Sequence, residues 1–468
     1  MTEPTTLEPA TDPVEAPEAA PEETPVVVPD AVDVNEFQRK SLASLHEIAQ
    51  GLGLRVAGVR SKHQLVFEIL RFYGSRGTVL EAEGFLDWAG EPVGFLRWPE
   101  FSFAPNADDV SVAAALLKER GLRTGQRLRC RVRAPRDREK TLAVEEVLEI
   151  EGIPVGEWRT PPSFDDLTAM FPSERLILET TEGSSPSPRV IDLIAPLGKG
   201  QRGLIVAPPR GGKTILLKNI AVSIHRNSPE VELIVLLLDE RPEEVTDFRE
   251  TVDASIYSST FDESPDRHIE VADMVLNRAK RLVENGRDVV VLLDSLTRLA
   301  RAHNSARQSG GGGGGGQGRQ HRGNGGGGGG GGPVGSGGIS PKALERSRRF
   351  FGAARNVDGG GSLTILATCL IETDSRMDDV IFEEFKGTGN MEITLDREMA
   401  ESRVFPAIHL LKSGTRKDEL LYHPDEFLRI GSLRKQLVQR PAPEAMVVLL
   451  KAIKSTRSNA ELLLRGIQ

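Results

Sequence analysis

One stretch of the sequence has the composition of a phosphate-binding loop. Between an apolar run and an amphipathic run, "GLIVAPPRGGKTILLKNIA" carries Gly211, Gly212, Lys213 and Thr214. A strand, a tight turn and a helix in this order allow backbone N–H groups and a helix N-terminus to bind phosphate. The Lys213 ammonium can then reach the β and γ phosphate oxygens, and the Thr214 hydroxyl can ligate Mg²⁺. The pattern indicates a nucleotide site, although Ala207 stands where the strict motif has its first glycine.

Carboxylates at the ends of two later apolar runs could complete a hydrolytic site. "VVVLLDS" ends in Asp294, which is suited to orient Mg²⁺ through its water shell. "IVLLLDERPEEV" contains Asp239 and Glu240, and a carboxylate at a strand tip can polarise the attacking water. We take Glu240 as the candidate base, with Asp239 and Glu243 as rivals. The alternative is that Glu240 caps the helix expected to begin near Pro242.

Two arginines further along the chain could neutralise charge on a transferring phosphoryl group. Arg403 and Arg416 lie in "ESRVFPAIHLLKSGTRKDELL", beside expected strand ends. Arginine often acts in this way from a neighbouring subunit. An ordinary surface ion pair is the alternative for each.

The elements that must position these residues belong to an α/β domain, which we place at residues 156–468. "RGLIVAPP", "VELIVLLLDE", "DVVVLLDS" and "SLTILATCLI" are apolar without alternation. Strands of this kind are buried on both faces, as in a mainly parallel sheet flanked by helices.

Three regions are expected before that domain. Residues 1–35 alternate acids with Pro, Ala and Thr, which predicts a disordered acidic tail. Residues 36–76 have helical apolar spacing, and residues 77–155 have short alternating runs typical of a small β-barrel.

The barrel region combines cations with aromatic rings. Alternate positions of one expected strand hold Arg127, Arg129, Arg131 and Arg133, hence on one face. With the rings of Phe95, Trp98, Phe101 and Phe103 nearby, this row suggests a groove for single-stranded nucleic acid. A solvated barrel face with core aromatics is the alternative.

Composition indicates in which cellular compartment we expect the protein. The 468 residues carry a formal charge of −9, much of it in the tail. No secretory leader pattern and no run of about 18 apolar residues occurs, so we expect a cytoplasmic protein without membrane segments. Cys130 and Cys369 lack metal-type spacing and are expected to be buried thiols.

A glycine tract interrupts the large domain. Residues 311–338 read "GGGGGGQGRQHRGNGGGGGGGGPVGSGG", with Arg319, His321 and Arg322 as the ionisable side chains. A glycine run loses too much backbone entropy to join a helix or a sheet, so we expect a mobile loop. Its charge favours an anionic neighbour.

Several motifs, in order, resemble bacterial transcription termination factor Rho, a hexameric RNA-dependent ATPase and RNA/DNA helicase. They are "VGFLR", "LRTG", "GLIVAPPRGGKT", "LLLDERPEEVTD", "LLDSLTRLARAHN", "RRFFGAARN", "EEFKGTGNME" and "RVFPAI…SGTRK". The resemblance runs from about Val34 to the C-terminus. It implies a RecA-like P-loop ATPase domain, preceded by a small helical module and an OB-fold (cold-shock-like) β-barrel.

The resemblance also implies roles for single residues. Glu240 and Lys213 would be catalytic, with Arg416 as an arginine finger acting across a subunit interface and Arg403 as its companion. Thr214 and Asp294 would hold Mg²⁺, Arg241 would sense the nucleotide, and Phe405 would stack on adenine. The remaining ATP-binding residues would be Gly198, Lys199, Gly200, Gln201, Arg202, Gly203, Arg210, Gly211, Gly212 and Ile215.

Two RNA sites are implied as well. The primary site in the barrel would use Phe95, Arg97, Asp109 and Glu139. The secondary site in a central pore would use Arg376, Gly335, Ser336, Gly337 and Gly338, which makes residues 310–338 a glycine-rich pore-loop insertion. Close relatives often carry aromatics where this chain has Val93, Ser111 and Thr141. We therefore predict a weaker or broader pyrimidine preference, unless Trp98 or Phe101 substitutes.

The function expected from this resemblance is a homohexameric motor that binds nascent single-stranded RNA, hydrolyses ATP and terminates transcription by pulling RNA through its pore. Its partners would be the RNA polymerase elongation complex and a NusG-type factor. One alternative is a catalytic subunit of a rotary or protein-export ATPase, which the arginine-rich barrel disfavours. Another is an RNA-binding regulator with a vestigial ATPase, which the intact Lys213, Glu240, Asp294 and Arg416 disfavour.

Overall fold

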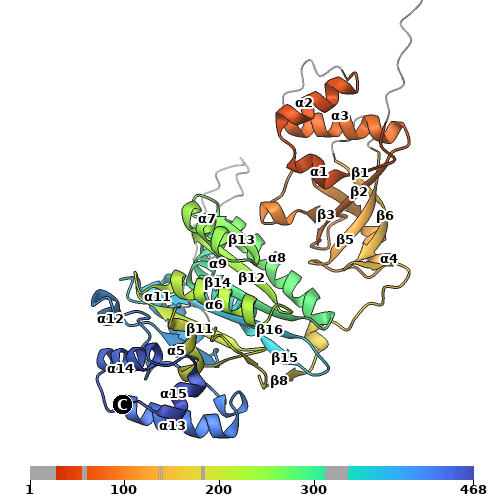
Figure 1. The fold of residues 1–468 in the computed structure, drawn as a ribbon. Helices are drawn as coiled ribbons and strands as arrows, with labels where there is room; N and C mark the ends of the chain where they lie inside the picture. Colours follow the sequence, from red (N-terminus) through yellow and green to blue (C-terminus); the bar gives the residue numbers. More distant parts are fainter. Residues whose placement is uncertain are drawn as a thin grey trace, which may run out of the picture.

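The molecule has an N-terminal barrel with helices beside a larger α/β domain, which ends in a group of C-terminal helices (Figure 1). The computed structural model describes residues 28–54, 61–134, 136, 139, 141–180, 185–310 and 336–467. None of the helices in this described part has the length and apolarity needed to cross a bilayer.

The first described segment corrects one expectation. Residues 28–35 were expected in the disordered tail, but β1 (Ala31–Asp33) pairs with the first barrel strand and α1 (Val34–Arg39) follows directly. Val34 and Phe37 are buried, and Asp33 caps the helix by accepting a hydrogen bond from the Asn35 backbone N–H. The burial of these apolar side chains explains why the segment from residue 28 onward belongs to the folded domain. The other helices of this region are α2 (Leu42–Gly51) and α3 (Lys62–Ser75).

The barrel forms as predicted. Its strands are ordered β2-β3-β4-β6-β5, and β5 also pairs with β2, which closes the barrel. Alternate residues of β2, β3, β4 and β5 are buried, such as Leu128, Cys130 and Val132 of β5. The elements are β2 (Val79–Asp87), β3 (Val93–Arg97), η1 (Pro99–Phe101), β4 (Val110–Ala113), α4 (Ala114–Glu119), β5 (Arg127–Arg133), β6 (Ala143–Ile150) and β7 (Ile153–Pro154).

The large domain is built on a mainly parallel sheet in the order β13-β12-β14-β16-β11-β17-β18, with the last pair antiparallel. The prediction of strands buried on both faces is confirmed. Its strands, with the short strands beside them, are β8 (Ala169–Met170), β9 (Arg175–Leu176), β10 (Leu197–Gly198), β11 (Arg202–Ala207), β12 (Glu232–Glu240), β13 (Ser255–Thr260), β14 (Asp288–Asp294), β15 (Arg355–Val357), β16 (Ser362–Leu370), β17 (Met391–Thr394) and β18 (Gly414–Thr415).

Helices cover both faces of this sheet. Along β11, Ile205 packs into the core beneath α5, α6, α7 and the C-terminal helices, whereas Leu204 and Val206 pack into the core beneath α8 to α11. The helices are α5 (Ser187–Ile194), α6 (Lys213–Asn227), α7 (Pro242–Thr251), α8 (Pro265–Glu284), α9 (Leu296–Gly310), α10 (Pro341–Gly352), α11 (Arg376–Lys386), α12 (Arg397–Glu401), α13 (Pro424–Val438), α14 (Ala442–Lys454) and α15 (Asn459–Arg465), with short turns η2 (Phe164–Asp166), η3 (Ser336–Gly338) and η4 (Asp418–Leu420).

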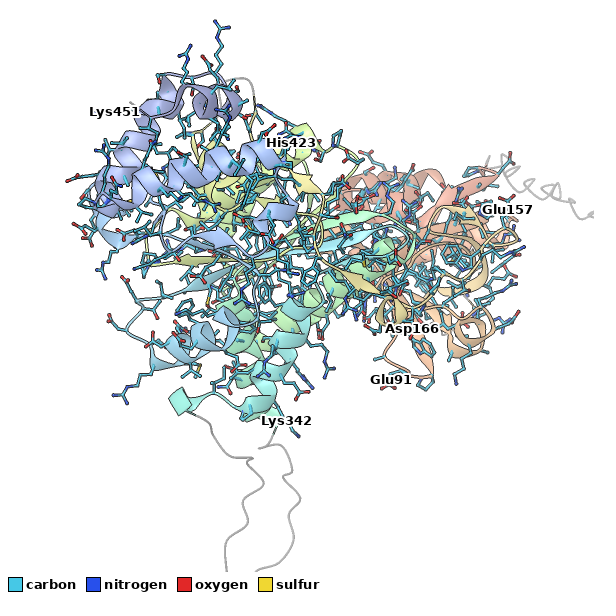
Figure 2. All side chains as sticks on the ribbon, turned by 90° about the horizontal axis from the view of Figure 1, so that it is seen from below. Glu91, Glu157, Asp166, Lys342, His423 and Lys451 are labelled. Atoms are coloured by element: carbon cyan, nitrogen blue, oxygen red, sulfur yellow. The ribbon has the colours of Figure 1, made fainter. Side chains whose placement is uncertain are left out.

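The two faces of the large domain therefore carry different elements. In Figure 2, Lys342 at the start of α10 lies on the opposite side of the domain from Lys451 of α14. The barrel meets the large domain at a third place, where Phe103 packs on Tyr257 with ring centroids 4.4 Å apart. The Ser258 backbone N–H donates to Ser102 Oγ over 3.0 Å at the same contact.

Candidate nucleotide site and RNA-facing surfaces

The predicted phosphate loop lies at the carboxyl end of the central sheet, between β11 and α6. Gly212 has a φ of +89°, which a residue with a Cβ rarely adopts, and it directly precedes α6. A cavity of ≈1120 Å³ opens over the loop. The lining includes the predicted loop residues Arg210, Gly211, Gly212, Lys213, Thr214 and Ile215, and also Glu240 and Arg241.

Lys213 lies between two carboxylates inside this cavity. Its Nζ donates to Glu240 Oε1 over 2.8 Å and to the Asp294 oxygens over 2.8 and 2.7 Å. Burial alone would lower the pKa of Lys213, but the two carboxylates outweigh burial and the pKa is raised. Burial and the neighbouring Asp294 raise the pKa of Glu240, against the opposing effect of Lys213. A buried carboxylate with a raised pKa has the property required of a base near neutral pH.

The rival interpretations of this carboxylate group can now be compared. The N-cap of α7 is Arg241, and no side chain makes the cap hydrogen bond, so Glu240 is not the helix cap. Glu240 is buried, whereas the Asp239 side chain is 42% exposed and lies 3.6 Å from Arg298. The geometry favours Glu240 over Asp239.

Two side chains that sequence reasoning missed hold these carboxylates in place. Arg298 Nη1 lies 3.3 Å from Glu240 Oε1, and Thr368 Oγ1 donates to Asp294 Oδ1 over 2.7 Å. Arg298 occupies the first turn of α9, directly after Asp294, and Thr368 lies on the adjacent strand β16. Arg298 could have been predicted from sequence, because it is a polar residue one turn after the strand-end Asp294. No sequence feature indicated that Thr368 contacts Asp294.

The oxygen atoms at this place fit Mg²⁺. The hydroxyl of Thr214 and the carboxylates of Glu240 and Asp294 are hard donors of the kind that this ion prefers, and Thr214 lines the same cavity. Mg²⁺ commonly takes one or two protein oxygens and completes its shell with water and phosphate. The donor set is therefore suited to a metal bound together with a phosphate ligand.

A second, smaller cavity of ≈280 Å³ adjoins the loop. It is lined in part by Gly211, Gly212, Ile215 and Phe405. A Cβ built on Gly212 would lie 3.6 Å from Phe405 Cε1, so the ring lies directly beside the loop, and it is 45% exposed. An exposed ring at the edge of a mainly apolar cavity is suited to stack on a flat base.

The structure does not bring residues 198–203 to this cavity. They precede or begin β11, and its ends lie roughly 17 Å apart at about 3.3 Å per residue. Their polar groups bond within the chain: Lys199 pairs with Glu174 and with Asp288, and the Gly200 N–H donates to Thr364 Oγ1 over 2.8 Å. The strand separates this stretch from the loop of its own chain, so its contact with ATP stays a prediction.

Arg403 and Arg416 are separated in the same way. Arg403 lies two residues before Phe405, after the carboxyl end of β17 and on the loop side of the sheet. Arg416 follows β18, where Thr415 pairs with Met391 and Met391 pairs with Gly203, at the amino end of β11. The two arginines therefore lie at opposite ends of β17 within one chain, and their action as companions stays a prediction. In the described part of the chain, neither guanidinium has a hydrogen bond or an ion pair.

Three of the four predicted primary RNA residues, Phe95, Arg97 and Asp109, lie together on the barrel. Arg97 donates to Asp109 and lies 2.9 Å from Asp87, and its guanidinium carbon lies 5.1 Å from the centroid of the Phe95 ring. Burial raises the pKa of Asp109, against the opposing effect of its hydrogen bonds and of Arg97. Glu139 lies apart from this group, and its pKa is lowered mainly by a hydrogen bond from Arg133.

The arginine row on β5 differs from its prediction. The side chains share one face of the strand, but each has a carboxylate opposite it. The pairs are Arg127–Glu83 at 3.8 Å, Arg129–Glu81 at 2.6 Å, Arg131–Glu146 at 3.0 Å and Arg133–Glu139 at 2.8 Å. Glutamates on the flanking strands β2 and β6 thus neutralise most of the charge that suggested a nucleic-acid groove.

Two of the candidate stacking rings are also buried. Trp98 is 1% exposed and Phe103 is 4% exposed, so neither can stack on a base without rearrangement. Phe101 is 41% exposed. Of the two substitutes considered for the missing aromatics, only Phe101 is therefore accessible.

The predicted secondary RNA segments meet on the α9 side of the domain. A Cβ on Gly337 would lie 2.9 Å from the Arg376 carbonyl oxygen, so η3 packs directly on the start of α11. Asn304 of α9 donates to the Gly338 carbonyl over 3.1 Å. Gly335, the side chain of Ser336 and most of the glycine tract lie outside the described residues.

Comparison with known proteins agrees with this arrangement. Residues 82–155 match the model of the Rho termination factor RNA-binding domain, and residues 187–310 match that of the ATP synthase alpha/beta family nucleotide-binding domain. Among solved structures, an ATPase of a bacterial type III secretion system is similar in fold, with a TM-score of 0.51 and 23% identity over 66% of this chain and 87% of that chain.

Curated relatives match nearly the whole chain. "Transcription termination factor Rho" of Akkermansia muciniphila is 51% identical over 94% of this chain and 88% of its own length. Its counterpart from Aquifex aeolicus is 47% identical over 92% of this chain and 94% of its own length. The full-length identity and the RNA-binding barrel separate this chain from rotary and export ATPases. It therefore belongs to the transcription termination factor Rho family, as an RNA-binding, RNA-dependent ATPase that terminates transcription.

Proposed function

We propose that this chain works as a homohexameric ring in which Arg416 of one subunit completes the nucleotide cavity of its neighbour. The observation that carries the proposal is the distance along β11: the phosphate loop follows its carboxyl end, whereas Arg416 lies beside its amino end. An arginine side chain cannot span that length to reach the cavity of its own subunit. Its exposed guanidinium is free to meet an anion on another copy.

Within each cavity we assign roles to the side chains described above. Phosphate oxygens compete with Glu240 and Asp294 for the Lys213 ammonium, which frees the Glu240 carboxylate to accept a proton from the attacking water. Thr214 and Asp294 would hold Mg²⁺, which when bound neutralises charge on the phosphates. Arg298 keeps Glu240 oriented, Arg241 contacts the terminal phosphate from the cavity rim, and Phe405 stacks on the base.

RNA would engage two places. The Phe95, Arg97 and Asp109 group binds the nascent strand on the barrel, and Arg376 with Gly337 and Gly338 contacts it in the pore. The contact between η3 and α11 supports a single pore surface formed by these two segments. Glu139 contributes by orienting Arg133. We place the ring in the cytoplasm, on RNA emerging from an elongating RNA polymerase, with a NusG-type factor as a further partner.

Subunit mixing tests the proposal. Lys213→Ala subunits have a disabled cavity and an intact Arg416, and Arg416→Ala subunits have the reverse. We expect each variant alone to be nearly inactive in single-turnover ATP hydrolysis with RNA. Mixed rings should regain hydrolysis wherever the intact cavity of an Arg416→Ala subunit lies next to a Lys213→Ala subunit, which supplies Arg416. Mixtures no more active than the sum of the two variants would overturn the action of Arg416 in trans.

A further inference from the structure

At the amino end of β11, Gln201 and Asn390 form a group of hydrogen bonds that lies away from the nucleotide cavity of the same subunit. Gln201 is 1% exposed, and its amide donates to Asn390 Oδ1 over 2.7 Å. The same Oδ1 accepts the Arg202 backbone N–H over 2.8 Å. One side chain, Asn390, therefore receives donors from two consecutive residues of the strand.

Asn390 is also the residue to which Arg416 is attached. The Arg416 backbone N–H donates to the Asn390 carbonyl oxygen over 2.8 Å. In the other direction, the Asn390 N–H donates to the Arg202 carbonyl over 3.0 Å. Gln201 and Asn390 thus link the start of β11 to the backbone of the arginine through an unbroken chain of hydrogen bonds.

The charged group beside Arg416 is another arginine, Arg202, and it does not attract the Arg416 side chain. Arg202 donates to the carbonyl oxygens of Ala354 over 2.9 Å and Thr388 over 3.3 Å, so its charge stays inside the subunit. Its pKa is lowered by burial and further by Arg355 and Arg416. Arg202 therefore repels the Arg416 guanidinium, which leaves backbone attachment to set its position.

We propose that Gln201 and Asn390 are positioning residues for Arg416, and that they fix the point from which it reaches the cavity of the next subunit. The proposal rests on the proposed action of Arg416 in trans. It also gives Gln201, within the stretch 198–203, a role at the nucleotide site of the neighbour, although this residue lies far from the cavity of its own subunit. Neither residue touches the reacting atoms.

The test uses full-length rings carrying Asn390→Ala. Removing Oδ1 frees Gln201 and the start of β11, and a small misplacement of a catalytic group can cost about 100-fold in rate. We expect kcat for RNA-stimulated hydrolysis to fall about 10- to 100-fold. The KM for ATP and the affinity for a fluorescent ADP analogue should stay unchanged, because the variant's own cavity is intact. A loss of analogue affinity would overturn the proposal.

Mixing then locates the defect. Asn390→Ala subunits mixed with Lys213→Ala subunits should regain single-turnover hydrolysis, as Arg416→Ala subunits do in the same mixture. If Arg416→Ala is complemented and Asn390→Ala is not, the positioning role is overturned while the trans action of Arg416 stands. If neither is complemented, the trans action fails and the positioning role fails with it.

Two further variants separate positioning from folding. Gln201→Met removes the donor at similar volume and should lower kcat in the same direction by a smaller factor; it replaces Asn390→Ala if that variant does not assemble. The matched control is Asn227→Ala at the end of α6, whose amide donates to the Ile177 and Glu179 carbonyls over 2.7 and 2.9 Å, away from both sites. An equal loss of kcat in this control would overturn the proposal.

Discussion

The arginine row on β5 and the single Arg416 were both predicted from sequence to meet an anion, and they differ in what surrounds them. The row on β5 recurs at every second residue, and glutamates of β2, of β6 and of the segment before β6 pair with its members. Arg416 stands alone after a two-residue strand, and in the described part of the chain its guanidinium has no carboxylate partner. The fold neutralises the charge of the regular β5 row and leaves Arg416 without a carboxylate partner in the described part of the chain.

The comparison teaches that partners distinguish a structural arginine from one available to a ligand. Exposed ion pairs contribute only about 0–1 kcal/mol each, but they occupy the guanidinium and cancel its field. An unpaired arginine beside a like charge, as Arg416 is beside Arg202, favours an anion from outside.

Replacing the unpaired arginine should have the largest effect. We expect Arg416→Ala to lower RNA-stimulated kcat about 10³-fold or more, because an arginine finger is worth that much in phosphoryl transfer. RNA affinity should not change. The measurement is steady-state hydrolysis with saturating poly(C), with Arg129→Ala from the paired row as the matched control. A similar loss in both variants would break the comparison.

The proposed base should follow. Glu240→Gln is expected to lower kcat by about 10²–10⁴-fold with nucleotide binding retained, since it removes the proton acceptor but keeps the size of the side chain. Because the pKa of Glu240 is raised, activity should fall, as the pH decreases, at a higher pH than an ordinary glutamate would give.

This acidic limb is read from the pH profile of kcat/KM, which reports the free enzyme. The residual activity of Glu240→Gln should lack the limb. An unchanged limb in the variant would assign the titration to another group.

In the barrel we expect a loss of RNA affinity of intermediate size when the Phe95 ring is removed. Phe95→Ala should weaken binding of short RNA by about 1–3 kcal/mol, the contribution of stacking on one base. Phe95 lies opposite Ser111 in the β3–β4 pair, where no second ring extends the stack. Oligo-C should therefore exceed oligo-A in affinity by only a modest factor. Titration of the full-length protein with both oligonucleotides tests this, and a preference for oligo-C by orders of magnitude would refute it.

The paired row should show the smallest effect. Arg131→Ala removes an exposed ion pair with Glu146, so we expect a change in unfolding free energy of about 0–1 kcal/mol and no loss of RNA affinity. Thermal unfolding and RNA titration at two salt concentrations measure both quantities. A large, salt-dependent loss of RNA affinity would show that the glutamates release the arginine to phosphate, which would remove the contrast with Arg416.

The nucleotide site was readable from sequence because its signals are local. Gly212, Lys213 and Thr214 are consecutive, and Glu240 and Asp294 end apolar strands. The carboxyl ends of parallel strands meet at one edge of a sheet, so the pattern alone predicted that these residues meet. The barrel, the helical module and the parallel sheet followed from residue periodicity in the same way.

Only the tertiary structure decided which groups are paired, which are free, and at which end of the sheet each lies. The carboxylates opposite the β5 row come from β2, from β6 and from Glu139 before β6, and no periodicity reveals cross-strand partners. Arg403 and Arg416 are close in sequence, yet the chain crosses from one end of β17 to the other between them. Sequence spacing determines which residue types follow one another along a strand; the pairing of strands determines their neighbours in space and therefore what each charge can bind.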